Sequence, residues 1–463
     1  MTKTRKITAI LALLAVISII VGLAPYRPEP KTETAASITE PPAETAPAET
    51  TVPEPTETPD NLYRGHWLDC QGRIIWYSKG TSRAAVEKYD ECFANLISDA
   101  SEVKLDETAE PYLRDHNPTP ILAEDDFHLI GRSMQMTVDA DKQLSAYELL
   151  RKYDIKGSIT VLNADGSIAC AASYPSFSHN SYIKDQEGTK TEVDCFNHQS
   201  FVNAASGSVF KIASGTLAAK YGILKMQDLG FCPTYEYSNW DYKDHPARYP
   251  CERTLQQALL NSSNYWFGQV FHKLGASRVS ADLKAYFAFD SEIHSDFGTL
   301  TQDMPLASNA DLVRAGFGQR MAASPLYLAA VGNAVVTGEM CRPHLFSHTV
   351  DSATLSPLET IWNDTVLCTV PAEYTAPVLE GMELVTADLG LYMDEGKTLF
   401  TKSGTAEINT EMYTDFLYLL CVVRDTSGET QSILLQVQNP QELGYEYARN
   451  AAPVMQEILQ IFN

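Results

Sequence analysis

A serine and a lysine three residues apart open an apolar segment, "GSVFKIASGTLAAK", at residues 207–220. On a helix, Ser208 and Lys211 would lie on the same face, about one turn apart. The first turn of a helix also offers free N–H groups and partial positive charge, which stabilise a developing oxyanion. The pair could therefore serve as nucleophile and base in acyl transfer. On its own the motif is weak, because serine and lysine are common residues.

The same spacing recurs in "SYIK", from Ser181 to Lys184, within a segment of Tyr, Pro, His and Asn that has no apolar helix behind it. A nucleophile must be held rigidly to be effective. We therefore expect Ser181 to have no catalytic role.

Two further motifs follow Ser208 along the chain. Ser262-Ser263-Asn264 forms S-x-N in a segment with helical periodicity, and Lys402-Ser403-Gly404-Thr405 lies on a late predicted strand. Another S-x-N, at residues 178–180, precedes Ser208 and is out of order. Three such motifs in this order are much stronger evidence for a catalytic site than one motif alone.

The order S-x-x-K, S-x-N, K-S/T-G resembles that of the penicillin-binding transpeptidases, which share a fold with serine β-lactamases. The segments "ITVLNADGSIACAASYPSF" and "GFGQRMAASPLYLAAVGNAV" are similar to the class B, monofunctional branch of that family. The resemblance runs from about Met134 to the C-terminus, and more faintly back to "RGHWLDCQGR", where class B enzymes begin a non-catalytic pedestal. Two residues depart from the family pattern: Ser206 stands where proline is frequent, and Arg320 where glycine is usual.

The resemblance implies a role for each residue of the first two motifs. Ser208 would attack the carbonyl of a D-Ala-D-Ala terminus and form an acyl-enzyme. Lys211 would be the base if neutral, a state that burial beside a second cation favours, or else an electrostatic orienter. Ser262 would relay a proton to the leaving amine, and Asn264 would hydrogen-bond to the amide of the substrate.

The third motif would bind the substrate. Lys402, with the hydroxyls of Ser403 and Thr405, would hold the terminal carboxylate, and Gly404 would let the substrate backbone lie close to the strand. By analogy with the family, the N–H groups of Ser208 and Thr405 would form the oxyanion hole. No cofactor or metal is expected: the ten histidines are scattered, and neither zinc spacing nor a phosphate-binding loop is present.

The surrounding segments predict the elements that position these residues. A helical period at Tyr147, Leu149, Leu150 and Tyr153 leads into two apolar strands about the turn "NADG". Helical segments fill the middle of the chain, and three strands and a last helix, residues 451–461, close it. Strands at both ends around a helical middle predict an α+β fold, with a largely antiparallel sheet flanked by helices.

The N-terminal residues predict that most of the chain is exported across the membrane. Basic residues precede the apolar run 7–24, which is near the lower limit for spanning a bilayer. Small Gly22 and Ala24 would also suit a cleaved signal peptide, although Pro25 argues against cleavage. The predicted organisation is a cytoplasmic n-region and single transmembrane anchor (1–25), a disordered Pro/Thr/Glu tether (26–60), a short pedestal-like module (61–133) and a transpeptidase domain (134–463). The catalytic domain would lie outside the cell membrane.

Charge and cysteine content limit the partners further. The chain has a formal charge of −24, which argues against nucleic acid as a partner. Nine cysteines do not form the dense, even pattern of a disulfide scaffold. Cys170, Cys368 and Cys421 are expected as small core residues on strands. Cys232 and Cys251 could form a disulfide, a question that the sequence leaves open.

The sequence thus predicts a membrane-anchored D,D-transpeptidase that cross-links peptidoglycan stem peptides, is acylated by β-lactams and works with a separate glycan polymerase. Two alternatives stay open: a D,D-carboxypeptidase or β-lactamase-type hydrolase, and a non-catalytic β-lactam sensor. The acceptor amine, the balance between transpeptidation and hydrolysis, the oligomeric state and a septal or lateral role in the wall are not predicted.

Overall fold

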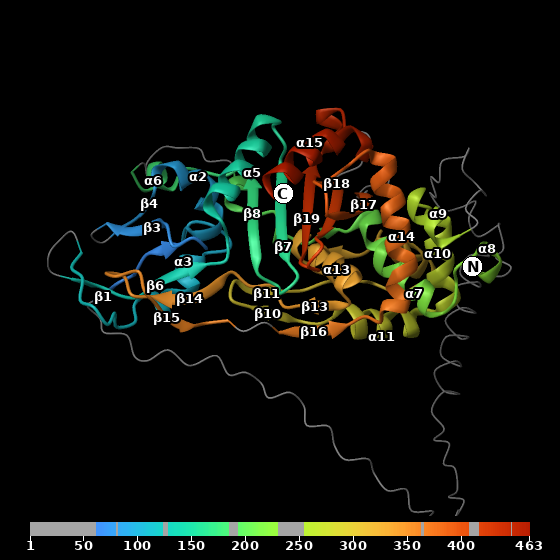
Figure 1. The fold of residues 1–463 in the computed structure, drawn as a ribbon, viewed down its shortest axis with the longest axis horizontal. Helices are drawn as coiled ribbons and strands as arrows, with labels where there is room; N and C mark the ends of the chain where they lie inside the picture. Colours follow the sequence, from blue (N-terminus) through green and yellow to red (C-terminus); the bar gives the residue numbers. More distant parts are fainter. Residues whose placement is uncertain are drawn as a thin grey trace, which may run out of the picture. The chain divides into compact units, whose positions relative to one another are not determined.

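The computed structural model describes residues 62–79, 82–123, 128–184, 193–229, 254–362, 365–406, 416–445 and 447–463. Its central element is a five-stranded antiparallel sheet with the order β17-β18-β19-β7-β8 (Figure 1). The strands are β7 Gly157–Asn163, β8 Ile168–Tyr174, β17 Thr398–Ala406, β18 Phe416–Arg424 and β19 Thr430–Gln438. The strand pair predicted before the nucleophile therefore completes a sheet begun by the last strands of the chain.

Helices cover both faces of this sheet. The helix α13, Pro325–Thr337, packs on β18, β19 and β7, whereas α5, Ala140–Lys152, and α15, Ala448–Ile461, pack from the other side (Figure 1). The contact with α13 is close at Gly332, where an added Cβ would lie 2.9 Å from the hydroxyl of Ser432. The predicted α+β arrangement, an antiparallel sheet flanked by helices, is confirmed.

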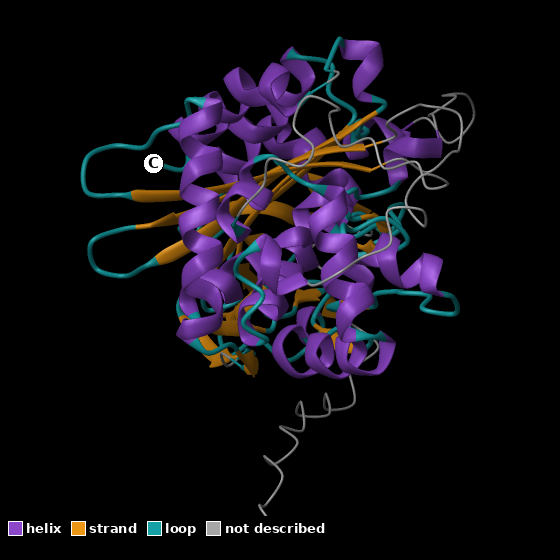
Figure 2. Ribbon diagram, turned by 90° about the vertical axis from the view of Figure 1, so that its right-hand side faces the viewer, coloured by secondary structure: helices purple, strands orange, loops and turns teal. Residues whose placement is uncertain are grey.

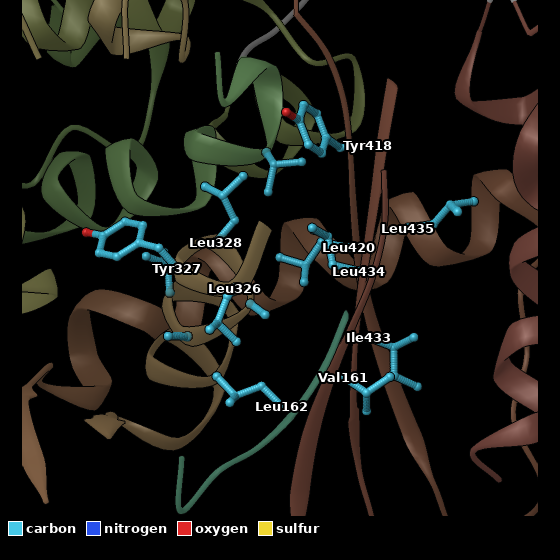
Figure 3. Close-up of a cluster of buried hydrophobic side chains, with 14 of the residues drawn as sticks. Val161, Leu162, Leu326, Tyr327, Leu328, Tyr418, Leu420, Ile433, Leu434 and Leu435 are labelled. Carbon is cyan, nitrogen blue, oxygen red and sulfur yellow. The ribbon is translucent and has the colours of Figure 1, made fainter. Parts of the chain in front are cut away.

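The core follows the alternation of side chains along the strands. Leu420 and Leu434 are paired across β18 and β19, and the neighbouring pair of Ile433 and Val161 points to the opposite face. Figure 3 shows Val161 beside Ile433, and Leu326 of α13 near Leu162. All these side chains are buried, so both faces of the sheet are apolar.

A group of helices packs around α7 and α14, on the side of the molecule that faces the viewer in Figure 2. The helix α7 is buried on all sides from Lys211 to Ala218, as expected of a helix without a polar face. The long helix α14 packs on β17, α7 and α9. The group comprises the 3-10 turn η3 Gly207–Phe210, α7 Lys211–Lys220, α9 Leu255–Leu260, α10 Asn264–Leu274, α12 Asn309–Gly316 and α14 Ala372–Leu389.

A second, six-stranded sheet has the order β15-β14-β6-β2-β3-β4. Its strands are β2 Trp67–Leu68, β3 Ile74–Lys79, β4 Ser82–Ala85, β6 Ser133–Met136, β14 Phe346–Val350 and β15 Pro357–Thr360. The last two come from the middle of the predicted transpeptidase domain. The domain boundary at residues 133/134 stays a prediction, and this sheet uses strands from both sides of it.

The remaining elements are short. The helices are α2 Asp90–Ile97, α3 Leu105–Thr108, α4 Glu110–Leu113, α6 His179–Lys184, α8 Met226–Leu229 and α11 Ala276–Phe287, with 3-10 turns η1 Glu87–Tyr89, η2 Val193–Phe196 and η5 Pro440–Leu443. Four two-stranded sheets pair β1 Leu62–Tyr63 with β5 Leu129–Ile130, β9 Ala204–Ala205 with β12 Ala322–Ala323, β10 Ile293–Ser295 with β11 Gly298–Leu300, and β13 Glu339–Cys341 with β16 Val366–Thr369.

The outer edge of β4 is covered by α6. The side-chain amide of Asn180 accepts a hydrogen bond from the N–H of Ala85 and donates one to its carbonyl, both at 3.0 Å. The ring of His179 lies 3.3 Å from the carbonyl of Arg83, on the same strand. These two side chains take the place of a neighbouring strand, so the edge is not left open.

None of the helices in the described ranges combines the length and the apolar character needed to cross a membrane. The predicted anchor and tether, and the cysteines at 232 and 251, lie outside these ranges. Cys170 and Cys421 are fully buried, as expected. Cys368 lies on a strand, as expected, but is only half-buried, at the margin of the core, because β16 is partly exposed.

Candidate active site

The predicted nucleophile lies in the 3-10 turn that leads into α7. Ser208 is half-buried, whereas Val209, Phe210 and Ile212 around it are fully buried. These apolar side chains fix the turn in the core and leave the serine at its surface. One turn further on, Lys211 is fully buried at the start of α7.

The S-x-N motif interrupts a helix. The predicted helical segment divides into α9 and α10, and Ser262 between them has a φ of 52°, in the left-handed region. Ser263 caps α10 by accepting a hydrogen bond from the N–H of Trp266, and Asn264 is the first residue of α10. The motif thus lies in a helical region, as predicted, but at a break between two helices, because an N-capping serine favours a new helix start.

Lys211 forms hydrogen bonds with the residues at this break between α9 and α10. Its Nζ donates to the carbonyl oxygen of Ser262 at 2.5 Å, to Ser262 Oγ at 3.1 Å and to Asn264 Oδ1 at 2.6 Å. The ring of Phe267 lies below the same amine, 5.8 Å from its centre. The first two sequence motifs are thus brought into direct contact.

Lys402 reaches the same serine from β17. Its Nζ donates to Ser262 Oγ at 3.1 Å and to the carbonyl of Ser403 at 2.7 Å. The side chain is fully buried, and this burial lowers the pKa of the amine from 10.5 to about 7. All three motifs therefore meet at the hydroxyl of Ser262.

This hydroxyl is suited to proton transfer. A serine oxygen has two lone pairs and one hydrogen. When both lysine amines donate to its lone pairs, the hydrogen of Ser262 is left for a third partner. A hydroxyl in this position can pass a proton outward and recover one from an amine behind it.

The strand β17 runs directly past the nucleophile. A Cβ added at Gly404 would lie 2.8 Å from the backbone nitrogen of Val209 and 3.2 Å from that of Ser208. Gly404 therefore brings the strand close to the turn, rather than making room for substrate alone as predicted. Ser403 and Thr405 alternate with it along the strand and are half-buried. The roles predicted for their hydroxyls stay predictions.

The two decoy motifs have structural partners. Ser178 donates its hydroxyl hydrogen to Asp90, and Asn180 caps β4 as described above. Ser181 is exposed, on the short helix α6 rather than in a loop. In the described ranges neither decoy contacts Ser208.

The structure explains the first departure from the family pattern but not the second. Ser206 donates its backbone N–H to the carbonyl of Met321 at 2.9 Å, a bond that proline cannot form. Arg320 has a φ of 65°, a conformation that glycine adopts without strain. The side chain of Arg320 is exposed, 3.8 Å from Asp311.

Sequence reasoning assigned no role to Gly318, although it lies against the nucleophile turn. Gly207 donates its N–H to the carbonyl of Gly318 at 3.0 Å. The signal was present in the segment "GFGQR", whose glycines are spaced as in a tight turn.

The fold and the site define a class: an α+β domain in which a serine at a helix start lies against the edge strand of an antiparallel sheet and two buried lysines meet at a second serine. Residues 157–460 match the family model of the penicillin-binding protein transpeptidase domain. The chain belongs to this family of transpeptidases.

Solved structures agree with this assignment. PBPA from Mycobacterium tuberculosis is 17% identical, with a TM-score of 0.67 over 86% of this chain and 98% of that one. The D,D-transpeptidase domain of a peptidoglycan glycosyltransferase from Eggerthella lenta is 18% identical, with a TM-score of 0.67 over 87% and 98%. Pseudomonas aeruginosa PBP2 is 18% identical, with a TM-score of 0.64 over 87% and 97%. A search of curated proteins finds no match.

Proposed function

We propose that this protein is a membrane-anchored, class B D,D-transpeptidase that cross-links peptidoglycan stem peptides through an acyl-enzyme on Ser208. The observation that supports this most directly is the hydroxyl of Ser262, 3.1 Å from the amines of both Lys211 and Lys402. Two buried amines around one hydroxyl, beside a half-buried serine, are poorly explained by stability alone, because buried amines are costly.

Acylation would use these groups in turn. Ser208 Oγ bonds to the carbonyl carbon of the penultimate D-Ala while its proton passes to Lys211. For this step Lys211 is neutral and donates only two of the three hydrogen bonds that its ammonium form can donate. The N–H groups of Ser208 and Thr405 stabilise the oxyanion. The bond to the terminal D-Ala then breaks, and its amine takes a proton through Ser262. Asn264 holds the amide of the substrate during these steps.

Transfer to the acceptor reverses this sequence. The amine of a second stem peptide attacks the ester carbon and loses its proton to the same base. The ester bond breaks, and Ser208 Oγ recovers a proton. The products are one new peptide bond and the free enzyme, with no net change in protons at the site.

The substrate would bind along β17. In the described ranges this strand pairs only with β18, so its outer side can accept an extended peptide. Lys402 and the hydroxyls of Ser403 and Thr405 would bind the terminal carboxylate. Charging Lys402 in this way would raise its lowered pKa, so substrate binding above pH 7 should take up a proton.

The relatives support β-lactam binding. Penicillin-binding protein A from M. tuberculosis forms acyl-enzyme complexes with imipenem and penicillin G. A β-lactam would acylate Ser208 here in the same way as the peptide. A separate glycan polymerase would supply the glycan strands, and the segment 7–24 would anchor the chain with its catalytic domain outside the cell.

The test is adduct formation by the full-length chain in detergent. We expect a labelled penicillin to add one acyl group, detected by intact mass, and Ser208→Ala to abolish it. Ser181→Ala, which removes the decoy serine, should leave it unchanged. Adduct on the Ser208→Ala protein would contradict the assignment.

The alternatives predict different fates for that adduct. Rapid loss in water would indicate a β-lactamase. A long-lived adduct with D-Ala release but no cross-linked dimer would indicate a carboxypeptidase. A long-lived adduct without any reaction on stem peptides would indicate a sensor. Dimer formation from donor and acceptor stem peptides is the result that we expect.

A further inference from the structure

Gly318 lies in direct backbone contact with the residue before the nucleophile. A Cβ added at Gly318 would fall 1.7 Å from the carbonyl oxygen of Gly207 and 2.6 Å from its carbonyl carbon. Gly318 has a φ of 83°, in the region that favours glycine. No other residue fits this position without moving the turn that carries Ser208.

The other side of the same turn rests on β17. A Cβ at Gly207 would lie 2.6 Å from the carbonyl oxygen of Thr405, and one at Gly404 would lie 3.2 Å from the backbone nitrogen of Ser208. Three backbone segments are thus stacked, each with a glycine at the contact. The nucleophile turn is the middle layer, between Gly318 and β17.

Hydrogen bonds hold the Gly318 segment to the turn over several residues. Gly207 donates to the carbonyl of Gly318 at 3.0 Å, and Ser206 donates to that of Met321 at 2.9 Å. The two-residue strands β9 and β12 continue this pairing. On its other side the segment is joined to the end of α12 by a hydrogen bond from the N–H of Gly318 to Ala315.

The helix α12 in turn packs on α10, which begins with Asn264. The Gly318 segment therefore connects the second motif, through α10 and α12, to the turn of the first motif. The turn that carries Ser208 also contacts the third motif, on β17. The thickness of the Gly318 segment therefore sets how far the backbone of Ser208 lies from that of Thr405.

We propose that Gly318 is a positioning residue for acyl transfer, which sets the relative placement of the N–H groups of Ser208 and Thr405. This inference rests on the proposed function, in which those two groups bind the oxyanion. Oxyanion donors act only over a narrow range of distance, so moving the middle layer would weaken one of them. Gly318 itself touches neither substrate nor reacting atoms.

The test is Gly318→Ala in the full-length chain, with penicillin acylation followed by stopped flow. The new Cβ must displace Gly207, so we expect the acylation rate constant to fall about 10- to 100-fold. The dissociation constant of the noncovalent complex should change less than about threefold, because the carboxylate site on β17 is not moved.

Gly275→Ala is the matched control. Gly275 has a φ of 80°, close to that of Gly318, but nothing lies within 4 Å of an added Cβ. It therefore places an alanine at a similar positive φ without displacing the turn. We expect its acylation rate constant to equal that of the wild type.

A purely structural effect of Gly318→Ala would lower the fraction of protein that acylates, seen in the burst amplitude, without slowing the folded fraction. An unchanged rate constant in that fraction, or an equal loss in Gly275→Ala, would overturn the proposal. If Gly318→Ala does not fold, Ser206→Ala tests the same contact, because its hydroxyl donates to the carbonyls of Gly318 and Met321 at 3.4 and 3.3 Å. We expect about a two- to fivefold slower acylation there, and no slowing would overturn the proposal.

Failure of this inference can be told from failure of the proposed function. Formation of an adduct on the Ser208→Ala protein would contradict the assignment of Ser208 as the nucleophile, whatever the result for Gly318→Ala. Adduct confined to Ser208 in the wild type, with full-speed acylation of Gly318→Ala, removes only the role of Gly318.

Discussion

Lys402 is a buried amine whose hydrogen bonds within the described ranges go to the neutral oxygens of Ser262 and Ser403. Burial without a carboxylate partner disfavours the charged form, which accounts for the lowering of its pKa from 10.5 to about 7. Below pH 7 both the folded and the unfolded chain hold the proton, and the full cost of burying the charge is present. Between pH 7 and 10.5 only the unfolded chain binds it, so Lys402 makes the folded state more stable as pH rises.

We therefore predict that Lys402→Met is more stable than the wild type at pH 7 and that this advantage shrinks as pH rises toward 9. The measurement is the thermal unfolding midpoint of both proteins at several pH values. Parallel curves, with a constant difference between the two proteins, would contradict the lowered pKa.

At this scale the sequence identified the residue types and their order but not their geometry. Ser208, Lys211 and Lys402 follow from the motifs. The left-handed conformation of Ser262 and its position between two amines depend on long-range contacts. Ser262 contacts Lys211, which is 51 positions earlier in the chain, and Lys402, which is 140 positions later. Such long-range packing leaves no local pattern in the chain.

At the scale of elements, the edge of β4 shows how a side chain can take the place of a strand. Asn180 binds both backbone groups of Ala85, and α6 that carries it is fixed by Ser178 and Asp90. An open edge would leave these groups without protein partners and would offer a template for pairing with another chain.

We predict that Asn180→Ala destabilises the protein by about 1–3 kcal/mol, since two partly buried backbone groups lose their partner. Thermal unfolding and light scattering would measure the loss and any self-association. Ser181→Ala, at an exposed neighbouring position, should leave the midpoint unchanged. The same midpoint for Asn180→Ala and the wild type would show that water replaces the amide without cost.

The helices and strands of the central sheet were largely predictable, because their apolar periods are long and regular. The break at 261–263 was not predicted, although its asparagine and serines are residues that favour caps. The addition of β14 and β15 to the second sheet could not be predicted. The strand β14 joins β6 across more than 200 residues, and β15 pairs with β14. Both segments are short, and their sequences contain no pattern that indicates a partner strand.

At the scale of the whole molecule, one continuous cluster of buried hydrophobic side chains includes both Trp67 of the second sheet and Leu434 of the first. A buried ion cluster lies beside it: Asp106 binds Arg64 and Arg83, and accepts a hydrogen bond from the indole of Trp67. Removing one member leaves buried charge without compensation.

We predict that Asp106→Ala lowers stability by about 3–5 kcal/mol and that the whole described chain still unfolds in a single transition. Tryptophan fluorescence and loss of penicillin acylation should report the same midpoint. Glu148→Ala, which removes an exposed ion pair with Arg151, is the control and should cost less than about 1 kcal/mol. An early transition seen by fluorescence alone would mean that the second sheet unfolds independently.

The stack of glycines at 207, 318 and 404 has a consequence for how the protein can change under selection. At each of these contacts the nearest atom is main chain, and even one added methyl group exceeds the space. Small side-chain substitutions cannot adjust the spacing there in small steps. If the enzyme is selected for slower reaction with β-lactams while it keeps its peptide substrate, we expect the substitutions to arise farther away, where they shift α12 or β17 as whole elements.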